Sequence, residues 1–480
     1  MNFRAIALPI GRLLVLISAM MIVPALADAL AGNRDWQVFL VSSLVLGTAG
    51  LLTALAFRGE PPPSNFREAI IFVNAAWFAF SCAGAVPFVF SELGIGITDA
   101  FFESASGLTT TGSTILTGLE TLPPGILLWR ALLQWIGGIG VVAIGIWLLP
   151  GLRVGGSQLF ALESSESSTK PYGHTWPFLV RLLALYAFLS ITCAALYMLC
   201  GMTAFNAVIH SMTTVSTGGF STSDQSFGQF PGVTVYWVAS LFMHTSSLPF
   251  LYLIRSVEKP PAKRDTQVLL LLAIIFVASF GVFLAERYVV YDTPFHMFTL
   301  AVFNVVSVIS TTGYAANDYL QFGPAVIGIF FVLTFLGGGG SGSTSGGFKM
   351  FRIAILANYL KCLLRKMVRP HRVLEPRYQG ALVPNAVLEG ILVFAVLYIG
   401  TFAGFAMIYF FLGLDLETAL SASITALANV GPGVGDTIGP SGTFQTLPDT
   451  AKWCLAIEMI LGRLEILAGI LLLTVDFWRD

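Results

Sequence analysis

Four short stretches of small and hydroxyl-bearing residues could bind a dehydrated cation through the protein backbone. They occupy residues 110–113, 216–219, 310–314 and 429–432, and each contains a glycine, namely Gly112, Gly218, Gly313 and Gly431. Carbonyl oxygens arranged in rings can replace the water shell of a monovalent cation. Glycine lets a strand take dihedral angles that other residues avoid. The chemistry that these residues suit is therefore coordination of a cation, without a covalent step.

The sequence before each stretch predicts the element that positions it. A short apolar run precedes each stretch and opens with a helix-start signal, which is Thr98-Asp99, Thr203, Thr293-Pro294 or Asp415. Thr and Asp cap helix N-termini, and Pro suits the first helical position. We expect a short helix that enters a membrane and returns as a strand, with the negative end of its dipole toward the cation. For any single Thr-Gly pair, the alternative is an ordinary turn between helices.

The composition indicates a membrane protein without a sizeable soluble domain. Hydrophobic residues make up 56% of the chain and charged residues 11%, far from the averages of soluble domains. Apolar runs long enough to cross a bilayer recur from one end to the other. The four glycines are spaced by 106, 95 and 118 residues, by subtraction of their numbers. Four repeats of one plan, and an all-α polytopic membrane fold, are therefore predicted.

The predicted organisation is a leading hairpin followed by four repeats, each a spanning helix, a short helix with its strand, and a second spanning helix. The expected units are the N-terminal transmembrane hairpin 1–60, pore repeat 1 at 61–150, repeat 2 at 151–255, repeat 3 at 256–375 and repeat 4 at 376–480. The expected spanning helices are 8–31, 36–57, 68–90, 125–149, 177–199, 234–254, 266–285, 324–365, 383–411 and 450–474. For residues 1–30 a cleaved signal peptide is the alternative interpretation.

Basic residues predict the orientation of these crossings. Nearly all of them fall on termini and loops assigned to one face, and the opposite face keeps only Arg34, Arg287 and Lys452. Because cytoplasmic loops carry the excess of Lys and Arg, the rich face and both termini are expected in the cytoplasm. The Thr-Gly strands then open to the outside.

One expected crossing is interrupted by a tract that cannot form a stable helix. The tract consists of Gly337, Gly338, Gly339, Gly340, Ser341, Gly342, Ser343, Thr344, Ser345, Gly346 and Gly347, and Lys349 follows it. Each glycine disfavours a helix by about 1 kcal/mol relative to alanine, and irregular backbone at membrane depth should line a cavity. We hypothesise that this loop lies under the Thr-Gly strands and closes the conduit, with Lys349 near the cation path. A flexible linker is the alternative.

Arg463 stands inside the last apolar segment, where an arginine is costly and usually faces a partner or a wet cavity. Glu458 and Glu465 are not at helical i,i+3 or i,i+4 spacing from it, so its partner is expected from another repeat. An electrostatic barrier below the strands and a structural ion pair are both open. Arg130 and Glu103 are expected to be structural pairing groups.

Several motifs together resemble the superfamily of potassium transporters, in particular its TrkH and TrkG branch, over essentially the whole chain. They are Thr-Thr-Thr-Gly-Ser-Thr at 109–114, Gln-Trp-Ile-Gly-Gly-Ile-Gly at 134–140, Ser-Thr-Gly-Gly-Phe-Ser-Thr at 216–222, Ser-Thr-Thr-Gly-Tyr at 310–314, Gly-Ser-Thr-Ser-Gly-Gly-Phe-Lys at 342–349, Asn-Val-Gly-Pro-Gly at 429–433 and Gly-Arg-Leu-Glu at 462–465. The leading hairpin favours this branch over the otherwise similar KtrB.

The resemblance implies potassium uptake through four M1–P-loop–M2 repeats around a pseudo-fourfold pore. By this resemblance the four glycines belong to a selectivity filter, and the residues before them supply carbonyls: Thr110, Thr111, Ser216, Thr217, Thr311, Thr312, Asn429 and Val430. The 337–349 tract matches the intramembrane gating loop of the family, and Arg463 matches its last-helix arginine. The glycine-rich start of the tract, 337–342, departs from the family pattern.

The resemblance also implies surroundings and partners. We expect a multi-pass protein of the bacterial inner membrane, a homodimer, on a TrkA-like cytosolic nucleotide-binding ring that docks on the basic loops 153–176, 255–265 and 361–380. Potassium is the transported ion, no cofactor or nucleic acid is implied, and the protein is not expected to be an enzyme.

Two rival functions stay open. A sodium-conducting or weakly selective transporter is the closer rival, although a glycine at position 112, where sodium-selective relatives can have serine, favours potassium. An intramembrane serine protease is the other, because Gly339-Gly340-Ser341-Gly342 fits a Gly-x-Ser-Gly pattern. A serine nucleophile needs a positioned base, and no histidine of the chain lies in a matching motif.

Overall fold

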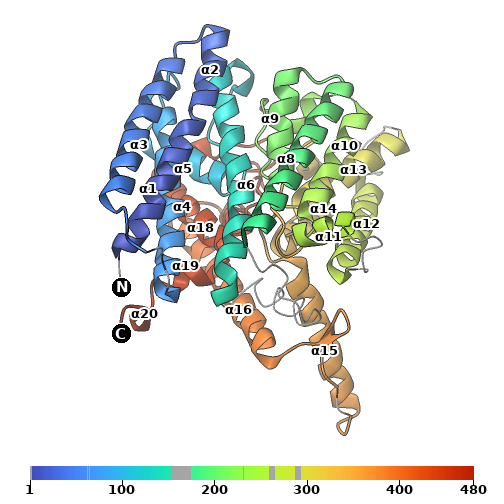
Figure 1. Cartoon of the computed structure of the whole chain (residues 1–480). Helices are drawn as coiled ribbons and strands as arrows, with labels where there is room; N and C mark the ends of the chain where they lie inside the picture. Colours follow the sequence, from blue (N-terminus) through green and yellow to red (C-terminus); the bar gives the residue numbers. More distant parts are fainter. Residues whose placement is uncertain are drawn as a thin grey trace.

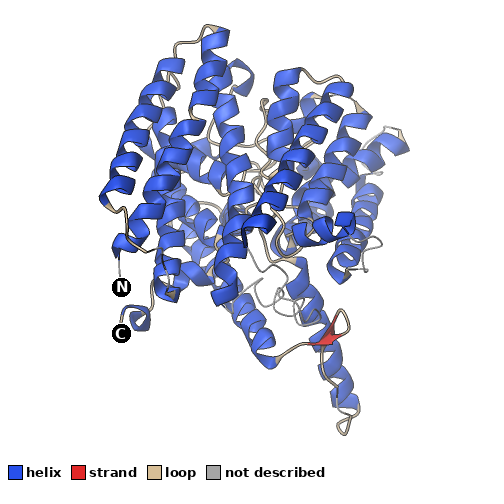
Figure 2. Ribbon diagram, viewed as in Figure 1, coloured by secondary structure: helices blue, strands red, loops and turns tan. Residues whose placement is uncertain are grey.

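The computed structural model describes residues 3–61, 63, 65–152, 175–230, 232–258, 265–286, 293–372 and 374–479. Within these residues the chain is a bundle of helices, as Figures 1 and 2 show, and the all-α fold class predicted from the sequence is confirmed. The described part contains one antiparallel pair of short strands, β1 (Arg377–Tyr378) and β2 (Ala381–Leu382), next to α15. Both chain ends lie at the same end of the bundle (Figure 1).

A helical hairpin opens the chain. It consists of α1 (Phe3–Met20), α2 (Ile22–Ala31) and α3 (Trp36–Ala56). Gly11 and Gly50 let the backbones of α1 and α3 touch, since a side-chain carbon on Gly11 would lie 2.8 Å from the carbonyl oxygen of Gly50. Small residues at such crossings are how helices pack closely within a membrane.

The four predicted repeats follow in order. Repeat 1 contains α4 (Phe66–Phe90), α5 (Ile97–Leu108) and α6 (Pro124–Leu152), and repeat 2 contains α8 (Thr175–Leu199), α9 (Ala204–Val215), α10 (Val233–Ser247) and α11 (Phe250–Glu258). Repeat 3 contains α12 (Thr266–Glu286), α13 (Pro294–Ile309), α14 (Pro324–Leu336) and α15 (Met350–Val368). Repeat 4 contains α16 (Asn385–Phe411), α17 (Leu416–Ala428), α18 (Asp449–Arg463), α19 (Leu467–Leu471) and α20 (Val475–Trp478).

Each repeat also has a short 3-10 turn between its Thr-Gly strand and its second long helix. These turns are η1 (Leu119–Thr121), η2 (Ser226–Gln229), η3 (Tyr319–Phe322) and η4 (Phe444–Thr446). The sequence does not predict this element, because the four turns share no motif. Its recurrence in all four repeats strengthens the fourfold plan.

Among the described residues, seven helices are long and apolar enough to cross a membrane, or eight if the bent pair α10 and α11 counts as one crossing. The seven are 3–31, 36–56, 66–90, 124–143, 177–199, 266–286 and 385–411. The two other expected crossings, 324–365 and 450–474, are each divided into separate helices.

Continuous helices were expected at 234–254 and 450–474, and both expectations are wrong. The first bends by 96° between α10 and α11. Pro249 explains this bend, because proline lacks the N–H that a helix needs and crowds the preceding turn. The last helix breaks after Arg463, where Glu465 and Ile466 both have positive φ, +58° and +59°. The second long helix is therefore interrupted in repeats 2, 3 and 4.

The starts of the short helices agree with their sequence signals in three repeats. Thr203 and Asp415 accept hydrogen bonds from the N–H groups of Asn206 and Thr418 at 3.3 and 3.0 Å. Pro294 takes the first position of α13. In repeat 1 the helix begins at Ile97, ahead of the expected signal, and Asp99 instead pairs with Lys452 at 2.6 Å.

Candidate functional site

The four Thr-Gly strands meet around one axis. A side-chain carbon placed on the key glycine of each strand would collide with a carbonyl oxygen of the next repeat, so only glycine fits. The contacts run from Gly112 to Gly218 O, from Gly219 to Thr312 O, from Gly313 to Val430 O and from Gly431 to Thr111 O. Because the fourth contact returns to the first strand, the repeats close a ring in chain order.

In the second strand, the structural counterpart of Gly112 is Gly219, one residue later than the expected Gly218. The equivalent glycines Gly112, Gly219, Gly313 and Gly431 have φ values of +86°, +79°, +81° and +109°. Two residues before each glycine stands a residue at left-handed φ: Thr110, Thr217, Thr311 and Asn429, at +55°, +53°, +58° and +55°. Gly218 completes the Thr-Gly pair of the second strand, so the sequence pattern favours it. The glycine that follows, Gly219, has the backbone conformation of Gly112.

Hydrogen bonds at the helix ends fix the same register. The N–H of the residue before each key glycine bonds to a carbonyl five residues earlier: Thr111 to Ser106 at 2.9 Å, Gly218 to Thr213 at 2.8 Å, Thr312 to Ser307 at 2.9 Å and Val430 to Thr425 at 3.0 Å. These N–H donors are therefore used within their own repeats. The short helices α5, α9, α13 and α17 thus end directly at the strands, and the negative ends of their dipoles lie there.

Two amide side chains, those of Gln134 and Asn429, hold the strands together, and the sequence analysis did not assign them this role. The Gln134 amide donates to the carbonyl of Gly218 at 2.6 Å and accepts from the N–H of Phe220 at 3.0 Å. The Asn429 amide donates to the hydroxyl of Thr111 at 2.9 Å and so joins repeats 4 and 1. A polar amide inside an apolar helix was the signal for Gln134, since such residues usually have a buried partner.

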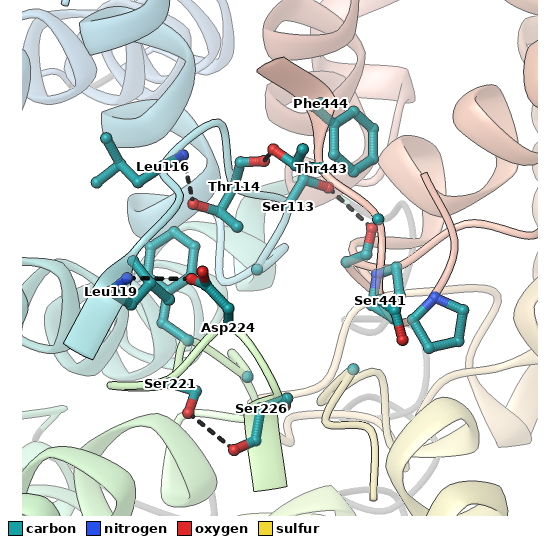
Figure 3. A pocket seen from close by; sticks show the side chains of 18 of the residues that line it. Ser113, Thr114, Leu116, Leu119, Ser221, Asp224, Ser226, Ser441, Thr443 and Phe444 are labelled. Atoms are coloured by element: carbon teal, nitrogen blue, oxygen red, sulfur yellow. Dashed lines mark hydrogen bonds between the residues drawn. The ribbon is translucent and has the colours of Figure 1, made fainter. Parts of the chain in front are cut away.

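A pocket of about 150 Å³ lies on one side of the ring (Figure 3). Its lining includes the key glycine of every repeat, Gly112, Gly219, Gly313 and Gly431. The pocket is therefore shared by all four repeats.

Two carboxylates, Asp224 and Glu120, join repeats 1 and 2 through hydrogen bonds at the wall of this pocket. Asp224 accepts hydrogen bonds from the N–H groups of Gly118 and Leu119 at 2.7 and 3.1 Å, and Figure 3 shows the contact with Leu119. In return, Glu120 accepts from the Ser223 hydroxyl at 2.5 Å and from the Asp224 N–H at 3.1 Å. The hydrogen bond from Ser223 lowers the pKa of Glu120 from its usual value. Glu120 is therefore ionised at neutral pH.

Arg130 and Glu103 form the expected structural pair beneath this wall. Their side chains are 1% and 0% exposed, and Nε of Arg130 lies 2.7 Å from Oε1 of Glu103. Arg130 also donates to the carbonyl of Ser221 at 2.9 Å, and Glu103 accepts from the N–H of Ile115 at 3.0 Å. The pair thus joins the first short helix to the chain that follows both the first and the second strand.

The glycine-rich loop between α14 and α15 lies against the other side of the strands. The N–H of Gly346 donates to the Thr311 hydroxyl at 2.8 Å, and the hydroxyls of Thr217 and Thr344 are 3.3 Å apart. A side-chain carbon on Gly346 would lie 2.5 Å from the carbonyl oxygen of Ala428, next to Asn429. The loop therefore contacts the beginnings of strands 2, 3 and 4, on the side away from the pocket.

The start of the loop is anchored by its backbone. The N–H groups of Gly338 and Gly340 donate to the carbonyls of Ile309 and Ser247 at 3.0 and 2.7 Å. The N–H of Ser341 donates to the amide oxygen of Gln267 at 2.8 Å. Most of the loop is buried, and these three N–H groups bond to protein, as irregular backbone at membrane depth requires.

The two basic residues assigned to the loop region have different partners. Lys349, which is 7% exposed, donates to the carbonyl of Ser345 in its own loop. Arg463 donates to the carbonyls of Thr344 and Gly137 at 2.8 and 3.3 Å. Its partners do come from other repeats, but among the described residues they are carbonyl oxygens and not a carboxylate.

The comparisons with known proteins agree with one another. The family model TrkH, described as a cation transport protein, matches residues 35–478. The Trk system potassium uptake protein TrkI of Halomonas elongata is 39% identical over 472 residues, which cover 97% of this chain and 95% of that protein. The Trk system potassium uptake protein TrkH of Vibrio parahaemolyticus is 32% identical over 499 residues and 100% of both chains. The crystal structure of the potassium transporter TrkH from Vibrio parahaemolyticus matches 100% of both chains with a TM-score of 0.90 and 31% sequence identity.

Proposed function

The chain belongs to the TrkH family of cation transport proteins, and we propose on this basis that it carries potassium into a bacterial cell. The family assignment made from the motifs is thereby confirmed. Its relatives are named potassium uptake proteins, and this chain aligns with them over nearly its entire length.

The closed ring of glycine-to-carbonyl contacts is the observation that carries this proposal. A cation that enters from the shared pocket meets four strands whose glycines leave no side chain in the way. Carbonyls of the strands would replace its water shell. The coordinating set is Thr110, Thr111, Gly112, Ser216, Thr217, Thr311, Thr312, Gly313, Asn429, Val430 and Gly431, with Gly218 joined by Gly219 in the second strand.

The carbonyls of this set are not equivalent. Those of Gly218 and Gly431 already accept hydrogen bonds, from Gln134 at 2.6 Å and from the Ser113 hydroxyl at 2.9 Å. An oxygen that accepts a strong hydrogen bond is a weaker ligand for a cation. Gly218 precedes its key glycine and Gly431 is a key glycine, so each of these two levels of the ring contains one weakened ligand.

In this proposal the loop 337–347, with Lys349 and Arg463, is the gate. It lies across the exit from the ring and is held there by hydrogen bonds to Ser247, Gln267, Thr311 and Arg463. Few side chains oppose its displacement, because its residues are glycine, serine and threonine. Ion passage then requires the loop to leave the axis, at the expense of these hydrogen bonds.

We further propose that the basic face is cytoplasmic, with both termini, and that a second copy of the chain and a TrkA-like nucleotide-binding ring assemble there. The exposed end of α15, which projects from the bundle in Figure 1, carries Lys361, Arg365 and Lys366. It offers a docking surface for an acidic partner. The other expected docking loops fall largely on residues 153–174 and 259–264, which lie outside the described residues.

Complementation of a bacterium that lacks potassium uptake tests the proposal. The unaltered chain should restore growth in low potassium. Gly112→Ser should not, because position 112 has φ +86° and its side chain would meet Gly218 O. Uptake of sodium by the same cells distinguishes a potassium transporter from a sodium-conducting or weakly selective one. Equal rescue by both chains, or by neither, would contradict the assignment of the strands.

A further inference from the structure

The break in the last membrane segment is held in an unfavourable backbone conformation. Glu465 and Ile466, between α18 and α19, have φ values of +58° and +59°. A β-branched residue in this region is rare, and two successive non-glycine residues there persist only when their surroundings fix them. No glycine or proline of the sequence requires a break at these two positions. The cause must therefore be tertiary.

Arg352 supplies a tertiary contact at this break. It stands in the first turn of α15, directly after the glycine-rich loop, and its side chain is 1% exposed. Its Nη2 lies 2.6 Å from Oε2 of Glu465. Its Nη1 donates to the carbonyl of Phe348 at 3.2 Å, and its Cζ lies 3.7 Å from the ring centroid of Phe394. The guanidinium is thus fixed on several sides, and Glu465 is drawn toward it.

The carboxylate of Glu465 lies in a region where buried positive charges surround the loop. Three cationic side chains, Lys349, Arg352 and Arg463, are buried beside the loop. Glu458, the other acidic residue of the segment, is committed elsewhere, to the hydroxyls of Tyr409 and Ser423 at 2.6 Å each. Among the described residues, Glu465 is the carboxylate that forms a salt bridge with this group of cations.

We propose that Glu465 is a positioning residue for the gate. Through Arg352 it keeps the last segment in its broken form, and the break places Arg463, two residues earlier, under the carbonyl of Thr344. Arg352, which follows the loop, and Arg463, which bonds to Thr344 within it, are thereby linked through Glu465. Loss of the pair frees both together and favours the displaced loop. This inference rests on the proposed role of the loop as a gate.

The test compares Glu465→Gln with a matched variant, Asp99→Asn, in cells that lack other potassium uptake. Lys452 and Asp99 form a salt bridge of the same length, 2.6 Å, with similar exposure, 5% and 23%, but this pair joins α18 to the first turn of α5, away from the loop. Initial uptake is measured against potassium concentration and divided by the amount of chain in the membrane. We expect Glu465→Gln to raise the maximal rate at least about threefold, with the half-saturating concentration unchanged. Asp99→Asn should leave both values unchanged.

A charge exchange separates a specific pair from general damage. The double variant Arg352→Glu, Glu465→Arg should return the rate toward that of the unaltered chain. If Glu465→Gln does not accumulate in the membrane, Glu465→Asp tests the inference instead. Aspartate keeps the charge, but its side chain is one methylene shorter, so its carboxylate lies farther from Arg352. We expect it to raise the rate at normal abundance. An unchanged rate per molecule in Glu465→Gln or Glu465→Asp, or a rise in Asp99→Asn of the same size, overturns the inference.

Failure of the proposed function has a different signature. If the unaltered chain shows no potassium uptake at normal abundance, the proposed function is wrong. If it takes up potassium and Glu465 variants behave as the unaltered chain does, only the positioning role is wrong.

Discussion

The guanidinium of Arg463 donates a hydrogen bond of 2.8 Å to the carbonyl oxygen of Thr344, near the middle of the glycine-rich loop. The two residues are 119 positions apart in the chain and belong to repeats 4 and 3. A second bond, of 3.3 Å, joins Arg463 to Gly137 of repeat 1. One side chain therefore links the loop to two other repeats, directly beneath the strands.

Arg463→Ala should raise potassium uptake per molecule. Hydrogen bonds to charged groups contribute about 1.5–3 kcal/mol each, so loss of the bond to Thr344 should shift the loop toward the displaced form by about tenfold or more. Uptake divided by membrane abundance measures the effect. Arg34→Ala, on an exposed turn, is the control and should change neither quantity. A fall in abundance with an unchanged rate per molecule would mean that Arg463 is only structural.

Gly346→Ala should also raise uptake, for a steric reason. The new methyl group would lie 2.5 Å from the carbonyl oxygen of Ala428 and 3.0 Å from Cβ of Asn429. The loop must then withdraw from the fourth strand. Gly328→Ala is the matched control, because a methyl group there meets no heavy atom within 4 Å. Equal uptake by both variants would argue that the loop does not limit the flux.

The register of the second strand predicts different outcomes for its two glycines. Gly219→Ala places a methyl group at φ +79° against the Thr312 carbonyl of the next repeat, so uptake should fall to background. At Gly218 the backbone φ lies outside the positive range, and the new group would meet the side chain of Gln134. Gly218→Ala should keep a measurable fraction of the rate. The reverse order of activities would restore Gly218 as the counterpart of Gly112.

Much of the fold could be predicted because its signals are local. Asp415 caps α17 as its position suggests, and the bend at Pro249 had a signal that the sequence analysis did not use. The break at Glu465 and Ile466 had none, and the salt-bridge partner of Glu465, Arg352, lies in another repeat. Gly218 and Gly219 are the same residue type, and the left-handed conformation of Thr217 and the hydrogen bond from the N–H of Gly218 to Thr213 decide between them. Sequence patterns thus indicate which segments converge, whereas tertiary contacts set their register.

The buried pair of Arg130 and Glu103 should be worth far more to stability than an exposed pair of the same length. Removing one partner of a buried pair leaves an uncompensated charge and costs about 3–5 kcal/mol. An exposed pair is worth about 0–1 kcal/mol. Arg181 and Glu258 provide that comparison, with a nitrogen-to-oxygen distance of 2.7 Å and side chains 50% and 39% exposed.

We therefore expect Glu103→Ala to lower the thermal midpoint of the purified protein strongly, and Glu258→Ala to leave it nearly unchanged. Because Arg130 also holds the carbonyl of Ser221 after the second strand, bound potassium should protect Glu103→Ala less than the unaltered chain. Thermal unfolding with potassium or with a large organic cation in its place measures both effects. Equal midpoints for the two variants would show that the wall of the pocket does not depend on this pair.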